Sequence, residues 1–96
     1  MPDDHPGQYR GFIWACAEFE ARLDQRCRHE QFGYGDFKEC EFALIALRSR
    51  HAEIIKKERF DRPLKHRALK ELQHCEALFA RYMERVFDAF EGSTYH

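Results

Sequence analysis

The chain has 96 residues, of which 44% are hydrophobic and 34% charged, and its formal net charge at pH 7 is -1. This length indicates a single domain, and no apolar run approaches the roughly 20 residues that a membrane-spanning helix needs. The acidic N-terminal segment does not resemble a signal peptide. We therefore expect a cytoplasmic protein whose four cysteines remain thiols and which makes no contact with a membrane.

Residues 1–6 contain two prolines and predict a flexible lead that precedes one helical domain at residues 7–92. The first helix is expected over residues 7–29, because its apolar side chains recur at spacings of three and four. These side chains are Phe12, Ile13, Cys16, Phe19, Leu23 and Cys27. Gly33 is expected as the residue just past this helix, where a left-handed backbone is easiest without a Cβ.

A second helix is expected from Asp36 to about Phe60. Asp36 and Glu39 form a capping-box pattern, in which the first side chain accepts a backbone N–H and the second reaches back to the cap. The apolar positions again keep helical spacing: Phe37, Cys40, Leu44, Leu47, His51, Ile54 and Ile55. The Asp-Arg-Pro segment 61–63 then supplies a stop and a new start.

The third helix is expected from Leu64 to Phe90, with Gly92 closing it and residues 93–96 forming a tail. Short turns between amphipathic helices favour antiparallel neighbours. The sequence therefore predicts an all-α fold, a three-helix antiparallel bundle with a long C-terminal helix. Phe87 and Phe90 continue the apolar stripe beyond the expected ends of the other helices, so we expect the chain to self-associate as a homodimer through them.

Positive charge is concentrated in residues 48–70, which hold nine Lys and Arg against three Asp and Glu. The segment has a net charge of +6, so the remaining residues carry -7. Its cations are the expected contacts for an acidic protein surface: Arg48, Lys56, Lys57, Arg59, Arg62, Lys65 and Arg67. One alternative is that these cations form an ordinary solvated helix end, where they complement the helix dipole. Another is that residues 48–70 bind nucleic acid without sequence preference.

The segment 32–37 between the first two helices is rich in aromatic residues and glycine. Phe32 and Tyr34 either fold under the end of the bundle or serve as exposed anchors for a partner, since aromatic residues dominate interface energies. The sequence leaves both alternatives open.

Several His, Cys and Glu residues have spacings that suit a metal ion or an acid–base pair. Cys27, His29 and Cys40 flank the first turn as weak zinc candidates, and buried core cysteine is the alternative. A second candidate is the Glu-x-x-His element of Glu71 and His74, which in a dimer would be completed by Glu18 or Glu20. His51 together with Glu20 is a weaker candidate acid–base pair, and a core histidine is the alternative.

The sequence contains no nucleophile constellation, no phosphate-binding loop and no complete ligand set for a metal. We therefore expect no enzymatic activity, no cofactor and no assigned metal site. The favoured hypothesis is a small regulatory protein-interaction module, of the adaptor, chaperone or inhibitor type, that binds an acidic protein partner. Non-specific binding of nucleic acid and a metal-carboxylate dimer are the alternatives.

Overall fold

The computed structural model describes residues 4–57 and 62–94, with the side chains of residues 8–57 and 63–90. This part of the chain consists of three helices without a strand: α1 (Asp4–Arg28), α2 (Tyr34–Lys57) and α3 (Arg62–Thr94). The predicted all-α three-helix bundle, with the longest helix last, is therefore confirmed. Within the described ranges, no helix combines the length and the apolar character that crossing a membrane requires.

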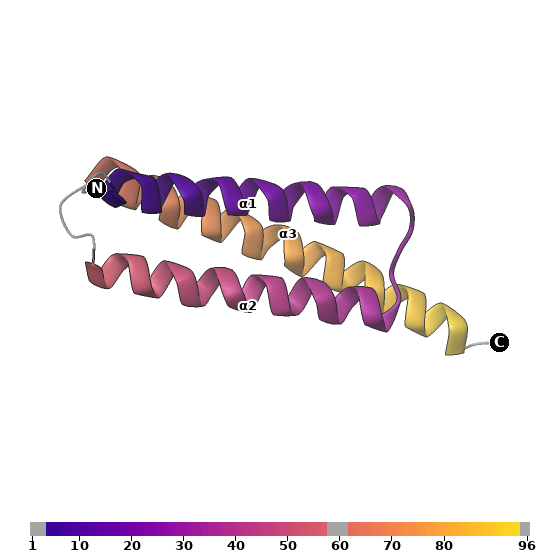
Figure 1. Ribbon diagram of the computed structural model, residues 1–96. Helices are drawn as coiled ribbons and strands as arrows, with labels where there is room; N and C mark the ends of the chain where they lie inside the picture. The colour runs from indigo at the N-terminus through magenta and orange to yellow at the C-terminus, as the bar shows by residue number, and fades with distance from the viewer. Residues whose placement is uncertain (1–3, 58–61, 95–96) are drawn as a thin grey trace.

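The three helices form a rod of 58 × 18 × 18 Å. α2 runs antiparallel to α1, and α3 turns back again, so α1 and α3 lie side by side with the same direction (Figure 1). The C-terminal end of α3 extends past the turn that joins α1 to α2 (Figure 1). One end of the rod therefore holds the α1–α2 turn and this extension, and the other holds the start of α1, the end of α2 and the start of α3.

The core follows the apolar stripes that helical periodicity predicts. α1 contributes five buried side chains, and α2 and α3 contribute matching rows at the same spacing: Tyr9, Phe12, Cys16, Phe19 and Leu23; Cys40, Leu44, Leu47, His51 and Ile54; Ala68, Leu72, Cys75, Phe79, Tyr82 and Val86. Tyr9 is completely buried, although the predicted stripe began only at Phe12. The core therefore reaches almost one turn closer to the N-terminus than the sequence pattern indicated.

The helix bounds differ from the prediction at several ends. α1 begins at Asp4, so part of the segment expected as a flexible lead is helical, and α3 continues through Gly92 to Thr94. The structure ends α2 at Lys57, and the expected end at Phe60 lies outside the described residues. Glycine weakens a helix by only about 1 kcal/mol, so one glycine near a helix terminus is a weak stop signal.

The end of α1 is a Schellman motif centred on Glu30, and the prediction that Gly33 supplies the left-handed residue is wrong. Glu30 has a φ of 54° and no glycine has positive φ. The Gln31 N–H donates to the carbonyl of Arg26 at 2.8 Å, and the Glu30 N–H donates to that of Cys27 at 3.2 Å. These two bonds satisfy helix-end carbonyls in the manner of this motif, although a side chain occupies the position that glycine favours.

The predicted capping box at Asp36 and Glu39 is also wrong. The Phe37 N–H donates to the carbonyl of Gly33 at 3.0 Å, so α2 begins two residues before Asp36. Both carboxylates instead accept hydrogen bonds from the Arg26 guanidinium, at 2.5 Å to Asp36 and 2.6 Å to Glu39. The acidic residues at the start of α2 therefore bind the end of α1 instead of capping their own helix.

Candidate functional site

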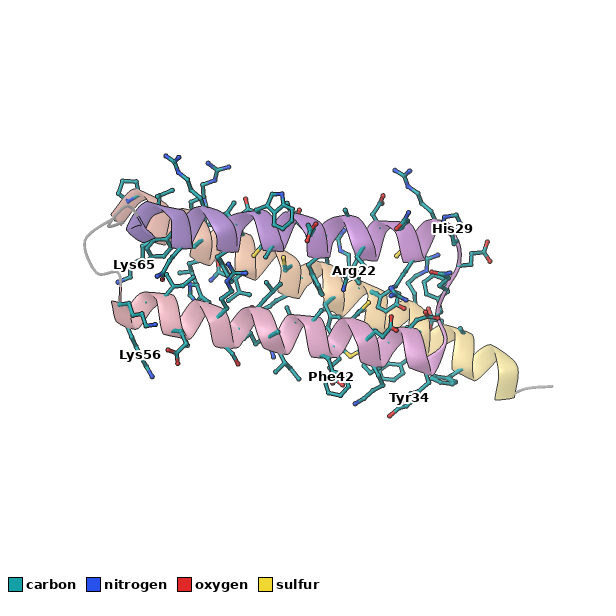
Figure 2. The ribbon with its side chains drawn as sticks, viewed as in Figure 1. Arg22, His29, Tyr34, Phe42, Lys56 and Lys65 are labelled. Carbon is teal, nitrogen blue, oxygen red and sulfur yellow. The ribbon has the colours of Figure 1, made fainter. Side chains whose placement is uncertain are left out.

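The cations predicted to bind a partner gather mainly at the end of the rod where α2 meets α3. Lys56 and Lys57 are exposed on the last turn of α2, Arg67 is exposed near the start of α3, and Lys65 is half-buried there. Lys56 and Lys65 lie at this same end in Figure 2. Arg59 lies outside the described residues, and so does the Arg62 side chain.

Arg48 belongs to a different environment from the other predicted contacts. Its Nε donates to Glu76 at 2.8 Å, which ties α2 to α3 along the length of the rod. None of Lys56, Lys57, Lys65 and Arg67 forms an ion pair with another described residue. Arg48 is therefore a structural contact, whereas the cations at the end of the rod remain available to a partner.

Two residues of α1 that the sequence reasoning missed join this surface. Trp14 is 64% exposed, and it lines a groove of about 470 Å³ together with Arg10 and Arg67. Ile13 and Leu64 supply apolar walls of the same groove. The signal in the sequence was the position of the single tryptophan off the apolar stripe of α1.

We call Arg10, Lys56, Lys57, Lys65 and Arg67 the basic end. A second groove of about 350 Å³ lies within it, between α2 and α3, and is lined by His51, Ile55, Lys65, His66 and Leu69. Three cations of the basic end, Arg10, Lys65 and Arg67, therefore line grooves that also have apolar walls. Apolar surface beside polar groups is typical of interfaces and not of a uniformly solvated helix end.

His51 lies at the floor of this second groove and is only 8% exposed. Its ring packs against Phe12 with centroids 5.4 Å apart, and its Nε2 has no hydrogen-bond partner. Burial lowers the pKa of His51 below its ordinary value, because desolvation disfavours the charged imidazolium. The structure does not pair His51 with Glu20, whose carboxylate accepts from His74 instead, so the candidate acid–base pair does not form.

The aromatic turn serves mainly to close the opposite end of the bundle. Phe32 is half-buried, its ring lies 5.8 Å from that of Tyr82, and the Arg85 guanidinium lies 4.9 Å from its centroid. The Tyr82 hydroxyl donates to the carbonyl of Gln31 at 2.7 Å, and burial raises the pKa of Tyr82 to about 12. Tyr34 is 60% exposed on the outside of this turn (Figure 2).

Two large apolar side chains are exposed near the C-terminal end of α3. Phe87 is 53% exposed and Phe90 is 44% exposed, although both continue the stripe that is buried at Val86. Phe87 retains one aromatic neighbour, since its ring centroid lies 6.4 Å from that of Phe37. The C-terminal part of α3 therefore carries an apolar patch that α1 and α2 cover only in part.

Among the described residues, only one group of His, Cys, Asp and Glu side chains is close enough to share a metal ion. It consists of Glu20 from α1 with Glu71 and His74 from α3, whose ligand atoms all lie within 4.8 Å of one another. Cys27, His29 and Cys40 are not brought into such a group, and all four cysteines are free thiols. The Glu-x-x-His element is thus joined by Glu20 from the same chain.

Two of the three comparisons with known proteins, those with curated proteins and with solved structures, find no match. The third comparison matches a family that is described as Protein ChrB, N-terminal. The match covers residues 3–93, which include all of the bundle core and both ends of the rod. The chain therefore belongs to the ChrB N-terminal family.

Proposed function

We propose that this domain is a non-enzymatic interaction module of the cytoplasm that binds an acidic surface of a protein partner through its basic end. It would act on that partner in the manner of an adaptor, chaperone or inhibitor. The single observation that carries the proposal is that Arg10, Lys56, Lys57, Lys65 and Arg67 have no ion-pair partner among the described residues. A row of unpaired cations at one tip is a favourable surface for complementary charge.

The apolar surface between these cations supports a protein partner over a simple anion. Trp14 lies in the groove that Arg10 and Arg67 also line, and Leu69 is 41% exposed next to Lys65. Tryptophan and arginine are the residues most enriched among those that contribute strongly to interface affinity. The basic end therefore offers both apolar anchors and charge complementarity.

Nucleic acid is the less favoured partner. The net charge of the whole chain is -1, so the acidic remainder of the molecule would repel a phosphate backbone that extends past the basic end. Trp14 could stack on an unpaired base between two arginines, which makes single-stranded nucleic acid the form to include in the test.

The test compares two charge-reversal variants with the same change in net charge. Arg10→Glu/Arg67→Glu alters the basic end, and Arg22→Glu/Arg81→Glu alters two exposed arginines that form no ion pair with a described residue. Each variant and the wild-type chain are used as bait in extracts of the native host. We expect a protein that is retained by the wild type and by Arg22→Glu/Arg81→Glu but lost with Arg10→Glu/Arg67→Glu.

A purified partner then completes the test by titration against the same variants and against Trp14→Ser. We expect an affinity loss of at least about tenfold for Trp14→Ser, since exposed tryptophans at interfaces contribute on the order of 2 kcal/mol. Equal retention of every captured protein by the two double variants would contradict the proposal. Binding of single-stranded DNA or RNA that collapses with salt, with no protein captured, would favour the nucleic-acid alternative.

We also propose that the chain self-associates through Phe87 and Phe90. The support is their exposure of 53% and 44% near the C-terminal end of α3. Sedimentation equilibrium at high concentration tests this, with Phe87→Ser as the variant and Phe42→Ser, at a 63% exposed site on α2, as the matched control. We expect a dimer that Phe87→Ser weakens and Phe42→Ser does not, and a wild-type monomer at all concentrations would contradict it.

A further inference from the structure

Three side chains with metal-binding atoms meet at the seam between α1 and α3, away from the basic end. Glu71 and His74 are three residues apart on α3 and therefore share one face of that helix. Glu20 approaches them from α1, with its Oε2 3.1 Å from the Nδ1 of His74. Each of the three offers one ligand atom, and these atoms lie within 4.8 Å of one another.

The charge balance of this cluster favours a bound cation. Neither Glu20 nor Glu71 forms an ion pair with a lysine or arginine of the described residues. Glu71 has no hydrogen-bond partner among them either, although it is half-buried. Two carboxylates at short separation repel each other, and the contact of Glu20 with His74 is the only ion pair that either of them forms with a described residue.

We propose that Glu20, Glu71 and His74 bind one divalent transition-metal ion of the Zn²⁺ type in each chain. Imidazole and carboxylate together suit zinc and its neighbours in the first row, whereas magnesium and calcium prefer sites made only of oxygen ligands. His74 is 58% exposed at its side chain, so water would complete the coordination. The site needs no second copy of the chain, because Glu20 supplies the third ligand.

The ligand set excludes the neighbouring thiol. Cys75 Sγ lies 3.8 Å from Glu20 Oε2, but it is completely buried and donates to the carbonyl of Cys16 at 3.5 Å. The three ligand atoms that lie within 4.8 Å of one another belong to Glu20, Glu71 and His74 and do not include this sulfur, so Cys75 remains outside the site.

Because the ligands come from two helices, a bound ion would hold α1 and α3 together and stabilise the folded state by mass action. The test is titration of Zn²⁺ into tag-free protein by calorimetry, with thermal unfolding as a second readout. We expect one ion per chain, a higher unfolding temperature with Zn²⁺, and no comparable effect of Mg²⁺. A Co²⁺-loaded sample should show ligand-field bands without thiolate charge-transfer bands.

Two ligand variants and one control locate the ion. Glu71→Gln and His74→Gln keep the shape of the side chains but remove ligand strength, and each should weaken Zn²⁺ binding at least about tenfold, the loss that even outer-shell changes cause. His66→Gln, at an exposed position of α3 outside the cluster, should bind as the wild type does.

Three results would overturn the proposal. The first is a wild-type chain that binds no Zn²⁺. The second is binding that both Glu71→Gln and His74→Gln retain in full. The third is a Co²⁺ spectrum with thiolate bands, which would assign the ion to the cysteines.

Discussion

Charged side chains have opposite surroundings at the two ends of the rod. At the α1–α2 turn, the Arg26 side chain is only 16% exposed, and its guanidinium donates to both Asp36 and Glu39. At the basic end, Lys56, Lys57 and Arg67 are exposed and pair with no described residue. The same residue types therefore fix the fold at one end and are left to solvent at the other.

This contrast separates the residues that hold the bundle together from those that a partner can use. A charge that is already neutralised within the fold gains little from a partner, and its removal leaves a buried counter-charge. An exposed, unpaired charge contributes little to folding, so its presence needs another reason. Substitutions at the two ends should therefore differ sharply in their effect on stability.

The largest expected effect is at the turn end, for Arg26→Ala. Removal of this guanidinium leaves Asp36, which is 34% exposed at its side chain, and Glu39 without their shared donor. We expect a loss of about 2 kcal/mol in the free energy of unfolding, measured by urea denaturation at pH 7. The buried Nε of Arg26 has no hydrogen-bond partner of its own, which keeps the expected loss below that of a fully satisfied buried pair.

Arg67→Ala at the basic end is the matched control for this measurement. Its side chain is exposed and unpaired among the described residues, so the free energy of unfolding should change by no more than about 0.5 kcal/mol. If Arg26→Ala and Arg67→Ala lowered the free energy of unfolding equally, the ion pairs of Arg26 would not contribute more to stability than the exposed cations of the basic end do.

A smaller effect of opposite sign is expected one turn further along, for Glu30→Gly. Glu30 has a φ of 54°, a conformation that costs a residue with a Cβ roughly 1 kcal/mol relative to glycine. Glycine would keep both backbone bonds of the Schellman motif and remove this strain, so the variant should be more stable by up to about 1 kcal/mol. The same urea titration measures it, and a less stable variant would show that the Glu30 side chain supports the turn.

The sequence predicted the helices well and the turn poorly, for a physical reason. Apolar spacing of three and four is a local property, so the stripes that end at Leu23, Ile54 and Val86 follow from it. The turn depends instead on Arg26, which meets Asp36 ten residues away. Both acidic residues of the expected capping box bind Arg26 instead, and local capping rules do not include contacts across a turn.

Some residues of the candidate sites could likewise be predicted from the sequence, and others depend on how the helices pack. The positive charge of residues 48–70 is visible in the sequence, and the Glu71–His74 spacing follows from helical geometry. Trp14 and Arg10 join the basic end only because α1 lies parallel to α3, which brings them to a groove with Arg67. The choice of Glu20 as neighbour of His74 likewise depends on the register of two helices that are not adjacent in the chain.

The smallest expected effect concerns His51, the buried titratable group beneath the basic end, and it appears only as a dependence on pH. Its pKa in the folded state is lowered from 6.5, so the unfolded chain takes up the proton first as the pH falls. Stability from this group is therefore present above about pH 6.5 and is lost as the pH falls below that value towards the folded pKa. The carboxylate of Glu76 acts in the opposite direction and raises the pKa of His51, but burial has the larger effect.

His51→Leu and His51→Gln separate the charge of this residue from its packing against Phe12. Neither replacement titrates, so both variants should lose less free energy of unfolding between pH 7.5 and pH 5 than the wild type loses. Leucine also removes the buried Nε2 that has no hydrogen-bond partner, whereas glutamine buries an amide in its place, so the leucine variant should be the more stable of the two at pH 7.5. If both variants kept the wild-type dependence on pH, the acid sensitivity would come from other groups, and the basic end would contain no charge-linked contribution to folding.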